Sequence, residues 1–449
     1  MRRVAITDTL SGGPKELQPG EGGRVGIYAC GPTTYGRIHI GNARPYVIFT
    51  LLKRFLEHEG LEARLVINVT DINDKIYDAA RDAGVASTEW AEGMTAAYRQ
   101  DTDRLGLGRP DAEPLASETL AEIVALIEAL IESGHAYQAN GDVYFRVRTF
   151  ADYGKLSNRN PDEMDQGEEA GSAQLKEDPL DFALWKGHKE GEDSSWPSPW
   201  GAGRPGWHIE CSAMAEKELG LDFAVHGGGT DLIFPHHENE LAQSESAHGV
   251  PLAEIWMHNG MVQLDEEKMS KSVGNIFQLS EALDQYGPEA VVAYLASGHY
   301  RQPLAFSDAL LEEARARVAG IRNYLRDAPG GDPDPFLADQ RDAFLDALAD
   351  DFNTPRAYAA IAAIVSEGNR RELPGARAVL EEMLPLLGLT SLLEEEERAD
   401  PEAEALLADR QEARAAKDFA RADEIRDRLA ELGWEVRDEA GGARLVRRA

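Results

Sequence analysis

Cysteine is nearly absent from this sequence, and long apolar segments are missing altogether. Only Cys30 and Cys211 occur among 449 residues, which excludes a secreted scaffold held by disulfides and a zinc ribbon of paired CxxC motifs. The first residues turn polar at once and lack the apolar core of a signal peptide. The longest apolar runs, such as residues 290–296, are far shorter than the roughly 20 residues that span a bilayer. We therefore expect a cytoplasmic protein with no membrane partner.

Positive charge is also scarce. The chain has 46 lysines and arginines against 80 aspartates and glutamates, which gives a formal net charge of −34. Such a chain repels nucleic acid at long range, so charge alone argues against a nucleic-acid partner, although it does not exclude a local basic patch. The simplest interpretation of this acidity is solubility. At 43% hydrophobic and 28% charged residues, the composition is otherwise typical of a globular protein.

Strand and helix patterns alternate in the first part of the chain. Residues 24–30 and 64–69 have the pattern of buried strands, and residues 42–59 between them have helical spacing. This order predicts a parallel sheet with a right-handed crossover. The pattern resumes after a segment rich in Pro and Gly, with a strand over residues 221–225, a turn at 227–229, a helix from Pro235 and a strand over residues 255–264.

Other patterns occupy the interval and the C-terminal part. Residues 84–150 are predicted to be mostly helical, and the polar residues 157–179 to form a long exposed loop or mobile insert. The parallel-sheet pattern is thus split by an insertion. Strand signals vanish from about residue 280, and residues 306–390 have helical periodicity. The tail opens with a helix and ends in a predicted hairpin around Gly441 and Gly442.

The motif His39-Ile40-Gly41-Asn42 stands between the first strand and the following helix. A helix N-terminus presents free N–H groups and the positive end of the dipole, which suit a phosphate. Gly41 permits close approach of the backbone, and His39 and Asn42 can donate hydrogen bonds to phosphate oxygens. Taken alone, such a histidine is more often a cap or a packing residue.

A second motif, Lys268-Met269-Ser270-Lys271-Ser272, follows a predicted strand. Two lysines with small hydroxyl residues suit a mobile cationic loop that closes on a pyrophosphate leaving group. By composition alone, a solvated surface loop is the simpler interpretation. The pairing with the earlier motif changes that balance, because together they resemble the HIGH and KMSKS signatures of class I aminoacyl-tRNA synthetases, the first in a HIGN variant.

Four further strings resemble cysteinyl-tRNA synthetases, and the resemblance covers essentially the whole chain. They are Tyr-Ala-Cys-Gly-Pro-Thr-Thr-Tyr at residues 28–35, Asn-Val-Thr-Asp-Ile-Asn-Asp-Lys at 68–75, Gly-Trp-His-Ile-Glu-Cys-Ser-Ala-Met at 206–214, and the segment from His226 to Glu240. The resemblance implies ATP-dependent ligation of L-cysteine to tRNA(Cys) through a cysteinyl-adenylate. It also implies ATP-binding and catalytic roles, with Mg²⁺, for His39, Asn42, Lys268 and Lys271, and an ATP-binding role for Gly41.

The resemblance further implies one Zn²⁺ per chain that binds the thiolate of the substrate cysteine. Its ligands would be Cys30, Cys211, His236 and Glu240. The residues themselves support this in part, because His236 and Glu240 are four apart at the start of a predicted helix and face the same way. No spacing rule pairs the two cysteines, for which buried structural residues are the ordinary alternative. The segment after His236 lacks the second histidine of an HExxH zinc peptidase.

Two groups of substrate-binding residues also follow from the resemblance. Thr70, Trp207 and Asp231 would bind the substrate cysteine. In the tail, anticodon contacts would come from Arg414, Phe419, Asp423, Arg426 and Asp438, with Phe419 stacking on a base. The alternative for the tail is an amphipathic helix with a solvated charged face and Phe419 in its core. The family implies a monomer.

The predicted fold class is α/β: a Rossmann-like parallel-sheet catalytic domain split by an insertion, followed by a helical domain and a small C-terminal α+β module. The expected boundaries are 1–125 and 201–265 for the two catalytic halves, 126–200 for the inserted connective domain, 266–310 for the KMSKS loop and stem-contact region, 311–395 for the helical bundle, and 402–449 for the anticodon-binding module.

Two alternatives to tRNA charging stay open. The nearest is a cysteine ligase of the mycothiol pathway, which acts on an aminosugar-inositol and lacks an anticodon module. The other is an inactive tRNA-binding protein, against which the intact motifs and zinc positions argue.

Overall fold

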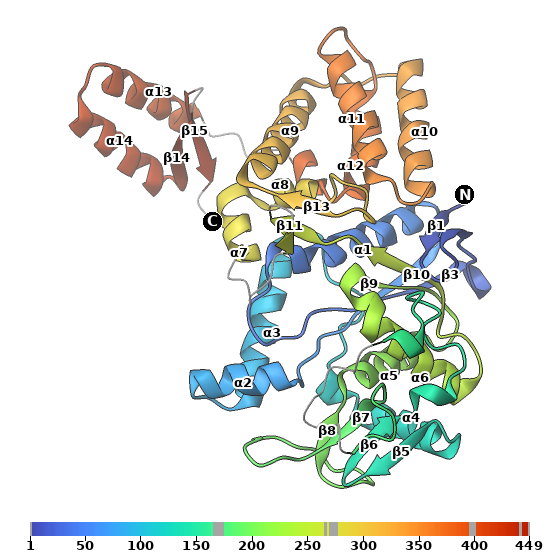
Figure 1. Cartoon of the computed structure of the whole chain (residues 1–449). Helices are drawn as coiled ribbons and strands as arrows, with labels where there is room; N and C mark the ends of the chain where they lie inside the picture. Colours follow the sequence, from blue (N-terminus) through green and yellow to red (C-terminus); the bar gives the residue numbers. More distant parts are fainter. Residues whose placement is uncertain are drawn as a thin grey trace. The chain divides into compact units, whose positions relative to one another are not determined.

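The computed structural model of the chain describes residues 2–164, 175–264, 267–268, 277–394, 401–439 and 442–447 (Figure 1). The chain divides into two compact units, Met1–Ser391 and Leu392–Ala449. No helix in the described part is both long and apolar enough to cross a membrane.

The first unit is built on a parallel sheet with the strand order β10-β9-β3-β4 (Figure 1). Its strands are β3 (Arg24–Ala29), β4 (Glu62–Ile67), β9 (Phe223–Gly229) and β10 (Ala253–Asn259). Helix α1 (Ile40–His58) is the crossover between β3 and β4, and α6 (Glu238–His248) connects β9 to β10. Helix α5 (Trp207–Leu219) leads into β9. The predicted parallel α/β sheet is therefore confirmed, and its strands end at one edge. A separate hairpin, β1 (Ala5–Asp8) with β2 (Gly13–Glu16), precedes it.

The glycines 227–229 were predicted to form a turn, and that prediction is wrong. They continue β9 and pair with residues 257–259 of β10. A Cβ at Gly227 would lie 2.1 Å from the ring of Phe49 in α1 and 2.6 Å from the Met257 carbonyl oxygen. Glycine is therefore present because the crossover helix and the neighbouring strand approach the backbone closely.

The helix predicted from Pro235 starts later, at Glu238. The turn Ile233–His237 precedes it, because Phe234 has an extended backbone conformation (φ −139°, ψ 133°) that interrupts helical geometry. The chain is thereby bent just before the first turn of α6. Likewise, the strand predicted over 255–264 divides into β10 and β11 (Val262–Leu264).

The insertion between the two halves contains a sheet that the prediction of a mostly helical 84–150 missed. Helices occur as expected in α3 (Ser87–Asp103) and α4 (Leu120–Glu132), and α2 (Asp74–Ala83) precedes the predicted helical range. An antiparallel sheet follows, made of β5 (Ala136–Ala139), β6 (Asp142–Phe145), β7 (Phe182–Gly187) and β8 (Gly203–Pro205). Asn140 and Gly141 turn β5 into β6 with φ of 53° and 90°. This Asn-Gly pair between aromatic residues is the sequence signal of a tight hairpin.

The predicted loop 157–179 is described at residues 157–164 and 175–179, where only a 3₁₀ turn (Pro161–Glu163) interrupts the irregular backbone. Its remaining residues, 165–174, lie outside the described ones.

The rest of the first unit is mainly helical. A small sheet joins β11 to β12 (Glu267–Lys268) and to β13 (Leu304–Phe306). The strand β13 departs from the expectation that strands vanish after residue 280, because its partner β11 lies some forty residues earlier in the chain. The helices are α7 (Leu279–Tyr286), α8 (Pro288–Leu295), α9 (Asp308–Asp327), α10 (Pro335–Ala349), α11 (Thr354–Gly368) and α12 (Ala376–Leu386).

The second unit has its own small core. Two helices, α13 (Pro401–Ala415) and α14 (Phe419–Glu431), pack with the antiparallel strands β14 (Trp434–Glu439) and β15 (Gly442–Arg447). Ala403, Ile425, Leu429 and Trp434 form the buried centre. The predicted terminal hairpin is confirmed.

Candidate functional site

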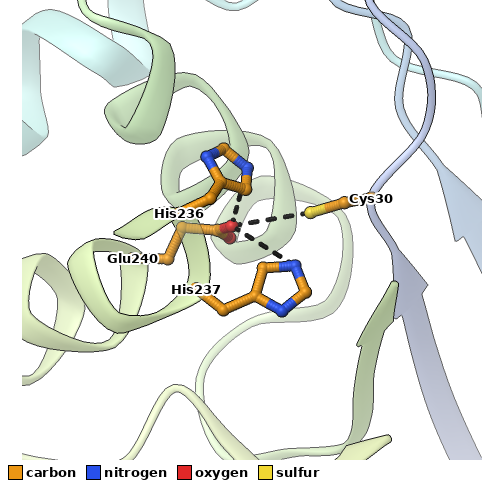
Figure 2. Close-up of side chains that lie close together, drawn as sticks. All are labelled: Cys30, His236, His237 and Glu240. Atoms are coloured by element: carbon orange, nitrogen blue, oxygen red, sulfur yellow. Dashed lines mark hydrogen bonds and ion pairs between the residues drawn. The ribbon is translucent and has the colours of Figure 1, made fainter. Parts of the chain in front are cut away.

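One group of potential metal ligands, among the described residues, is buried at the carboxyl edge of the parallel sheet. Its members are Cys30, His236, His237 and Glu240, whose donor atoms all lie within 4.8 Å of one another (Figure 2). Oε1 of Glu240 is 3.0 Å from Nε2 of His236, 3.5 Å from Sγ of Cys30 and 3.9 Å from Nε2 of His237. The group therefore offers sulfur, nitrogen and oxygen donors at one point.

Neighbouring ends of secondary structure position these ligands. Cys30 directly follows β3, the two histidines end the turn Ile233–His237, and Glu240 lies in the first turn of α6. Strands β3 and β9 are adjacent and parallel, so the segments after them meet at the same edge. The spacing of four between His236 and Glu240 brings their side chains together, as the helix geometry predicts.

Cys211, the remaining predicted ligand, lies on α5 with 1% of its surface exposed. Its thiol hydrogen-bonds with Cys30 and with His236. It is outside the group of four described above, which contains His237 instead. The structure thus brings all four sequence-predicted ligands to one edge of the sheet and adds His237.

Burial and neighbouring groups shift the pKa values of this cluster in different directions. The hydrogen bond with Cys30 is the main reason that the pKa of Cys211 falls to about 6, whereas burial raises the pKa of Cys30 well above its usual range. Burial alone would raise the pKa of Glu240, but His226 and His236 hold it well below its usual range. Burial would lower the pKa of His236, but the Glu240 carboxylate raises it to about 10. A bound metal ion would replace this proton.

Further buried histidines surround the cluster. His226 positions Glu240, because its Nε2 is 2.8 Å from Oε2 of the carboxylate and leaves Oε1 facing the other ligands. The remaining hydrogen bonds join His237 Nδ1 to His258 Nε2 (2.8 Å), His258 Nδ1 to Thr9 Oγ1 (2.7 Å), and His208 Nδ1 to His236 Nδ1 (2.9 Å).

Sequence reasoning missed His208, His226, His237 and His258. His237 adjoins a predicted ligand, so its position was a usable signal. The others come from different strands and helices, and no spacing rule connects them.

Of the three predicted cysteine-binding residues, Trp207 is the one whose contact with the ligand cluster the structure shows. Trp207 opens α5, and its ring stacks on that of His236 at 4.2 Å and 22°. Thr70 is buried and its Oγ1 accepts a hydrogen bond from the Asn68 side chain at 3.3 Å. Asp231 lies in the exposed turn Thr230–Leu232 after β9.

The first predicted ATP motif starts helix α1. His39 is its N-cap residue, and the Asn42 side chain accepts a hydrogen bond from the His39 backbone N–H at 3.1 Å. A Cβ at Gly41 would lie 2.9 Å from the His39 ring, so the glycine allows the ring to lie against the helix N-terminus. The motif therefore lies at a helix N-terminus, as the sequence predicts, and its binding of phosphate stays a prediction.

The second motif is only partly described. The backbone of Lys268 belongs to β12, and Lys271 lies outside the described residues. The described residues resume at Phe277, whose carbonyl accepts a hydrogen bond from the Ile40 N–H at 3.0 Å. Phe277, five residues after the second motif, is therefore hydrogen-bonded to the start of the helix that carries the first motif.

The predicted anticodon residues lie in the second unit. Phe419 opens α14 and is 63% exposed, so it is not a core residue of the amphipathic helix. Arg426 pairs with Asp423 on the same helix at 3.0 Å, and Arg414 lies in the last turn of α13. Asp438 belongs to β14.

Comparisons with known proteins agree along the whole chain. Residues 16–316 match the model described as "tRNA synthetases class I (C) catalytic domain", 343–391 match "DALR domain", and 397–445 match "Cysteinyl-tRNA ligase anticodon binding domain". The Cysteine–tRNA ligase of Caldicellulosiruptor saccharolyticus is 43% identical and aligns with 99% of this chain and 100% of its own length. The Cysteine–tRNA ligase of Symbiobacterium thermophilum is 44% identical and aligns with 98% of this chain and 99% of its own length.

A solved structure supports the fold. Mycobacterium tuberculosis methionyl-tRNA synthetase in complex with methionyl-adenylate matches with a TM-score of 0.59 and 16% identity, over 82% of this chain and 88% of its own. This solved structure shows the fold alone, whereas the family models and the full-length relatives also show the family. The chain belongs to the cysteinyl-tRNA synthetases, class I enzymes that join cysteine to tRNA.

Proposed function

We propose that this enzyme works in two steps with a zinc-based selection of cysteine. The carboxylate of L-cysteine attacks the α-phosphate of ATP, which gives cysteinyl-adenylate and releases pyrophosphate. A terminal ribose hydroxyl of tRNA(Cys) then attacks the activated carbonyl, loses its proton and displaces AMP, which gives the cysteinyl ester of the tRNA. The observation that carries the proposal is the buried group of sulfur, imidazole and carboxylate donors at the sheet edge.

The donor set fits Zn²⁺. Cys30, Cys211, His236 and Glu240 are the types of ligand that zinc takes, and their burial excludes competing water. The buried Nε2 of His237 has no hydrogen-bond partner among the described residues, which supports a positive ion nearby. Zinc bound there would supply a Lewis acid that prefers a thiolate to a hydroxyl and so separates cysteine from serine. Shape alone separates the two poorly.

Side chains next to the ligand cluster orient the substrate cysteine. The Trp207 ring lies over His236 and shields the cluster, which favours a desolvated thiolate. Thr70 and Asp231 are proposed to hold the amino-acid backbone of cysteine. No side-chain nucleophile is needed, because the substrate carboxylate itself attacks.

The phosphates of ATP, with Mg²⁺, are assigned to the two motifs. His39 and Asn42 donate to phosphate oxygens at the N-terminus of α1, where the helix dipole favours negative charge. Gly41 allows close approach of the nucleotide. Lys268 and Lys271 stabilise the charge that develops on the leaving pyrophosphate. The anticodon contacts are assigned to Arg414, Phe419, Asp423, Arg426 and Asp438, and the exposed Phe419 ring supports a stacking role.

The test is charging of tRNA with labelled cysteine, with serine as control and a zinc assay on the same sample. We expect cysteine-specific charging, about one zinc per chain, and cysteine-dependent ATP–pyrophosphate exchange that a chelator abolishes and added zinc restores. Cysteine activation without tRNA charging would instead favour an aminosugar ligase. Equal use of serine, or full activity without zinc, would overturn the metal assignment. Light scattering tests the proposed monomer, and cell fractionation the proposed cytoplasmic location.

A further inference from the structure

Arg44, in the second turn of α1, is a buried cation that binds only backbone carbonyl groups in the described part of the chain. It is 1% exposed. Its Nη1 donates to the carbonyl oxygens of Gly260 at 2.6 Å and Gln302 at 2.8 Å, and its Nη2 donates to that of His299 at 3.1 Å. Burial lowers the pKa of Arg44 to about 10, so the side chain stays cationic at pH 7. Burying a charge without an ion pair is costly, which indicates that these three carbonyls require the guanidinium.

The three carbonyls surround the point where the chain leaves the parallel sheet. Strand β10 ends at Asn259 and β11 starts at Val262, so Gly260 belongs to the two-residue junction between them. The Gly260 N–H donates to the Tyr300 carbonyl at 2.7 Å, and a Cβ at Gly260 would lie 2.2 Å from the Gln302 carbonyl oxygen. The carbonyl oxygens of Gly260 and Gln302 both accept from the same Nη1, and without this cation their dipoles would repel each other. Arg44 therefore holds the junction against the segment that follows α8.

This junction controls how the two proposed ATP motifs lie relative to each other. Strand β11 pairs with β12, in which Lys268 lies opposite Gln263. The same strand also approaches the first motif, because a Cβ at Gly41 would lie 3.5 Å from the Cβ of Val262. Arg44 follows Gly41 by three residues on one helix. Its guanidinium thus links the N-terminal part of α1 directly to the start of the strand pair that carries Lys268.

We propose that Arg44 is a positioning residue for adenylate formation, because it holds the strand pair that carries Lys268 in place beside the His39 motif. The inference rests on the proposed roles of these two motifs in binding ATP. Arg44 acts through the backbone of Gly260 and Gln302, and it contacts no substrate. Lys268 is assigned to the charge that develops on the leaving pyrophosphate. A displaced Lys268 should therefore lower kcat for the first step much more than it raises KM.

The experiment measures cysteine-dependent ATP–pyrophosphate exchange by the full-length, zinc-loaded enzyme, with rates expressed per active site. Arg44→Lys keeps the charge but loses the planar fork that reaches three carbonyls. We expect kcat to fall about 30-fold, with KM for ATP and for cysteine changed by less than about twofold and with unchanged zinc content. Gly260→Ala leaves Arg44 in place but forces the junction away from Gln302, so it should give the same separation of kcat from KM.

Arg54→Lys is the matched control. This arginine also lies on α1 and also donates to carbonyls, those of Pro385 at 2.9 Å and Leu107 at 2.7 Å, which belong to neither β10 nor β11. Urea unfolding should show both lysine variants destabilised to a similar degree, but Arg54→Lys should keep the parental kcat. Equal losses of kcat in Arg44→Lys and Arg54→Lys, or a rise in KM alone in Arg44→Lys, would show a purely structural role and overturn the proposal.

Two further outcomes keep the proposal and the proposed function apart. If Arg44→Lys does not fold, Gly260→Ala decides, and a parental kcat in that variant would overturn the positioning role. The unaltered enzyme is measured first in every series. If it shows no cysteine-dependent exchange, the proposed function itself is wrong and the positioning role is wrong with it. If it exchanges normally and Arg44→Lys does too, only the positioning role is wrong.

Discussion

Gly31, next to the proposed ligand Cys30, has no room for a side chain. A Cβ there would lie 1.8 Å from the carbonyl oxygen of Asn68, whose side chain also accepts the Gly31 N–H at 2.9 Å. We expect Gly31→Ala to lower the free energy of unfolding by about 2–3 kcal/mol, because the backbone must move. Gly93→Ala, where nothing lies within 4 Å, should raise it by about 0.5–1 kcal/mol. Urea unfolding of both variants checks this, and equal effects would contradict the close approach.

Cys211 is the residue at which zinc binding and folding can be separated. Cys211→Ser should lower zinc affinity at least about 100-fold and abolish cysteine-dependent exchange, because a serine hydroxyl is a poor zinc ligand. Far-UV circular dichroism should remain that of the parent, since the two side chains are nearly isosteric. Met214→Leu, one turn further along α5 and equally buried, should retain zinc. Full exchange activity in Cys211→Ser would remove it from the ligand set.

Among the helices, Glu382 on α12 connects three elements. Both of its oxygens accept from Arg341 on α10 at 2.6 Å, and Oε1 is 2.9 Å from Nε2 of His58 at the end of α1. Arg341 is the main reason that the pKa of Glu382 lies below its ordinary value of 4.5. A carboxyl group whose pKa is lowered by folding contributes its full stabilisation when the pH is above its ordinary, unfolded-state pKa. This contribution is lost as the pH falls through the folded-state pKa.

Glu382→Gln should therefore cost about 1 kcal/mol at pH 7, after allowance for solvent screening. The difference from the parent should shrink as the pH falls below 4.5. Unfolding followed from pH 7 down to acid checks the sign. Glu381→Gln, an exposed neighbour that pairs with Arg377 on the same helix, should change stability by less than about 0.5 kcal/mol at every pH. A difference for Glu382→Gln that grows toward acid would contradict the linkage.

Some helices and strands could be predicted from the local sequence pattern, and others could not. The crossover from β3 through α1 to β4 was predicted within two residues, since its periodicity is local. The insertion sheet was missed although Asn140-Gly141 between aromatic residues is a hairpin signal. The prediction of a turn at the glycines of β9 was wrong. Glycine is required there because Phe49, which belongs to another element, approaches the strand, and local sequence does not reveal that contact.

For the whole molecule, the division into two units predicts that activation and charging separate. Deleting residues 402–449 should leave cysteine-dependent exchange unchanged, because the ligand cluster and the His39 motif belong to the first unit. The efficiency of tRNA charging should fall about tenfold or more, as the anticodon contacts are lost. Exchange and charging kinetics on the same preparations check this. Unchanged charging would assign the second unit another task.

The sequence by itself determined the class of the fold, the two nucleotide motifs and the family, because these depend on local periodicity and on strings of adjacent residues. Tertiary structure alone decided which distant side chains meet. Cys30 and Cys211 stand far apart in sequence, and His226 and His258 come from different strands, yet all lie around Glu240 or its neighbours. The physical reason is that parallel strands bring their carboxyl ends to one edge, whatever the length of chain between them.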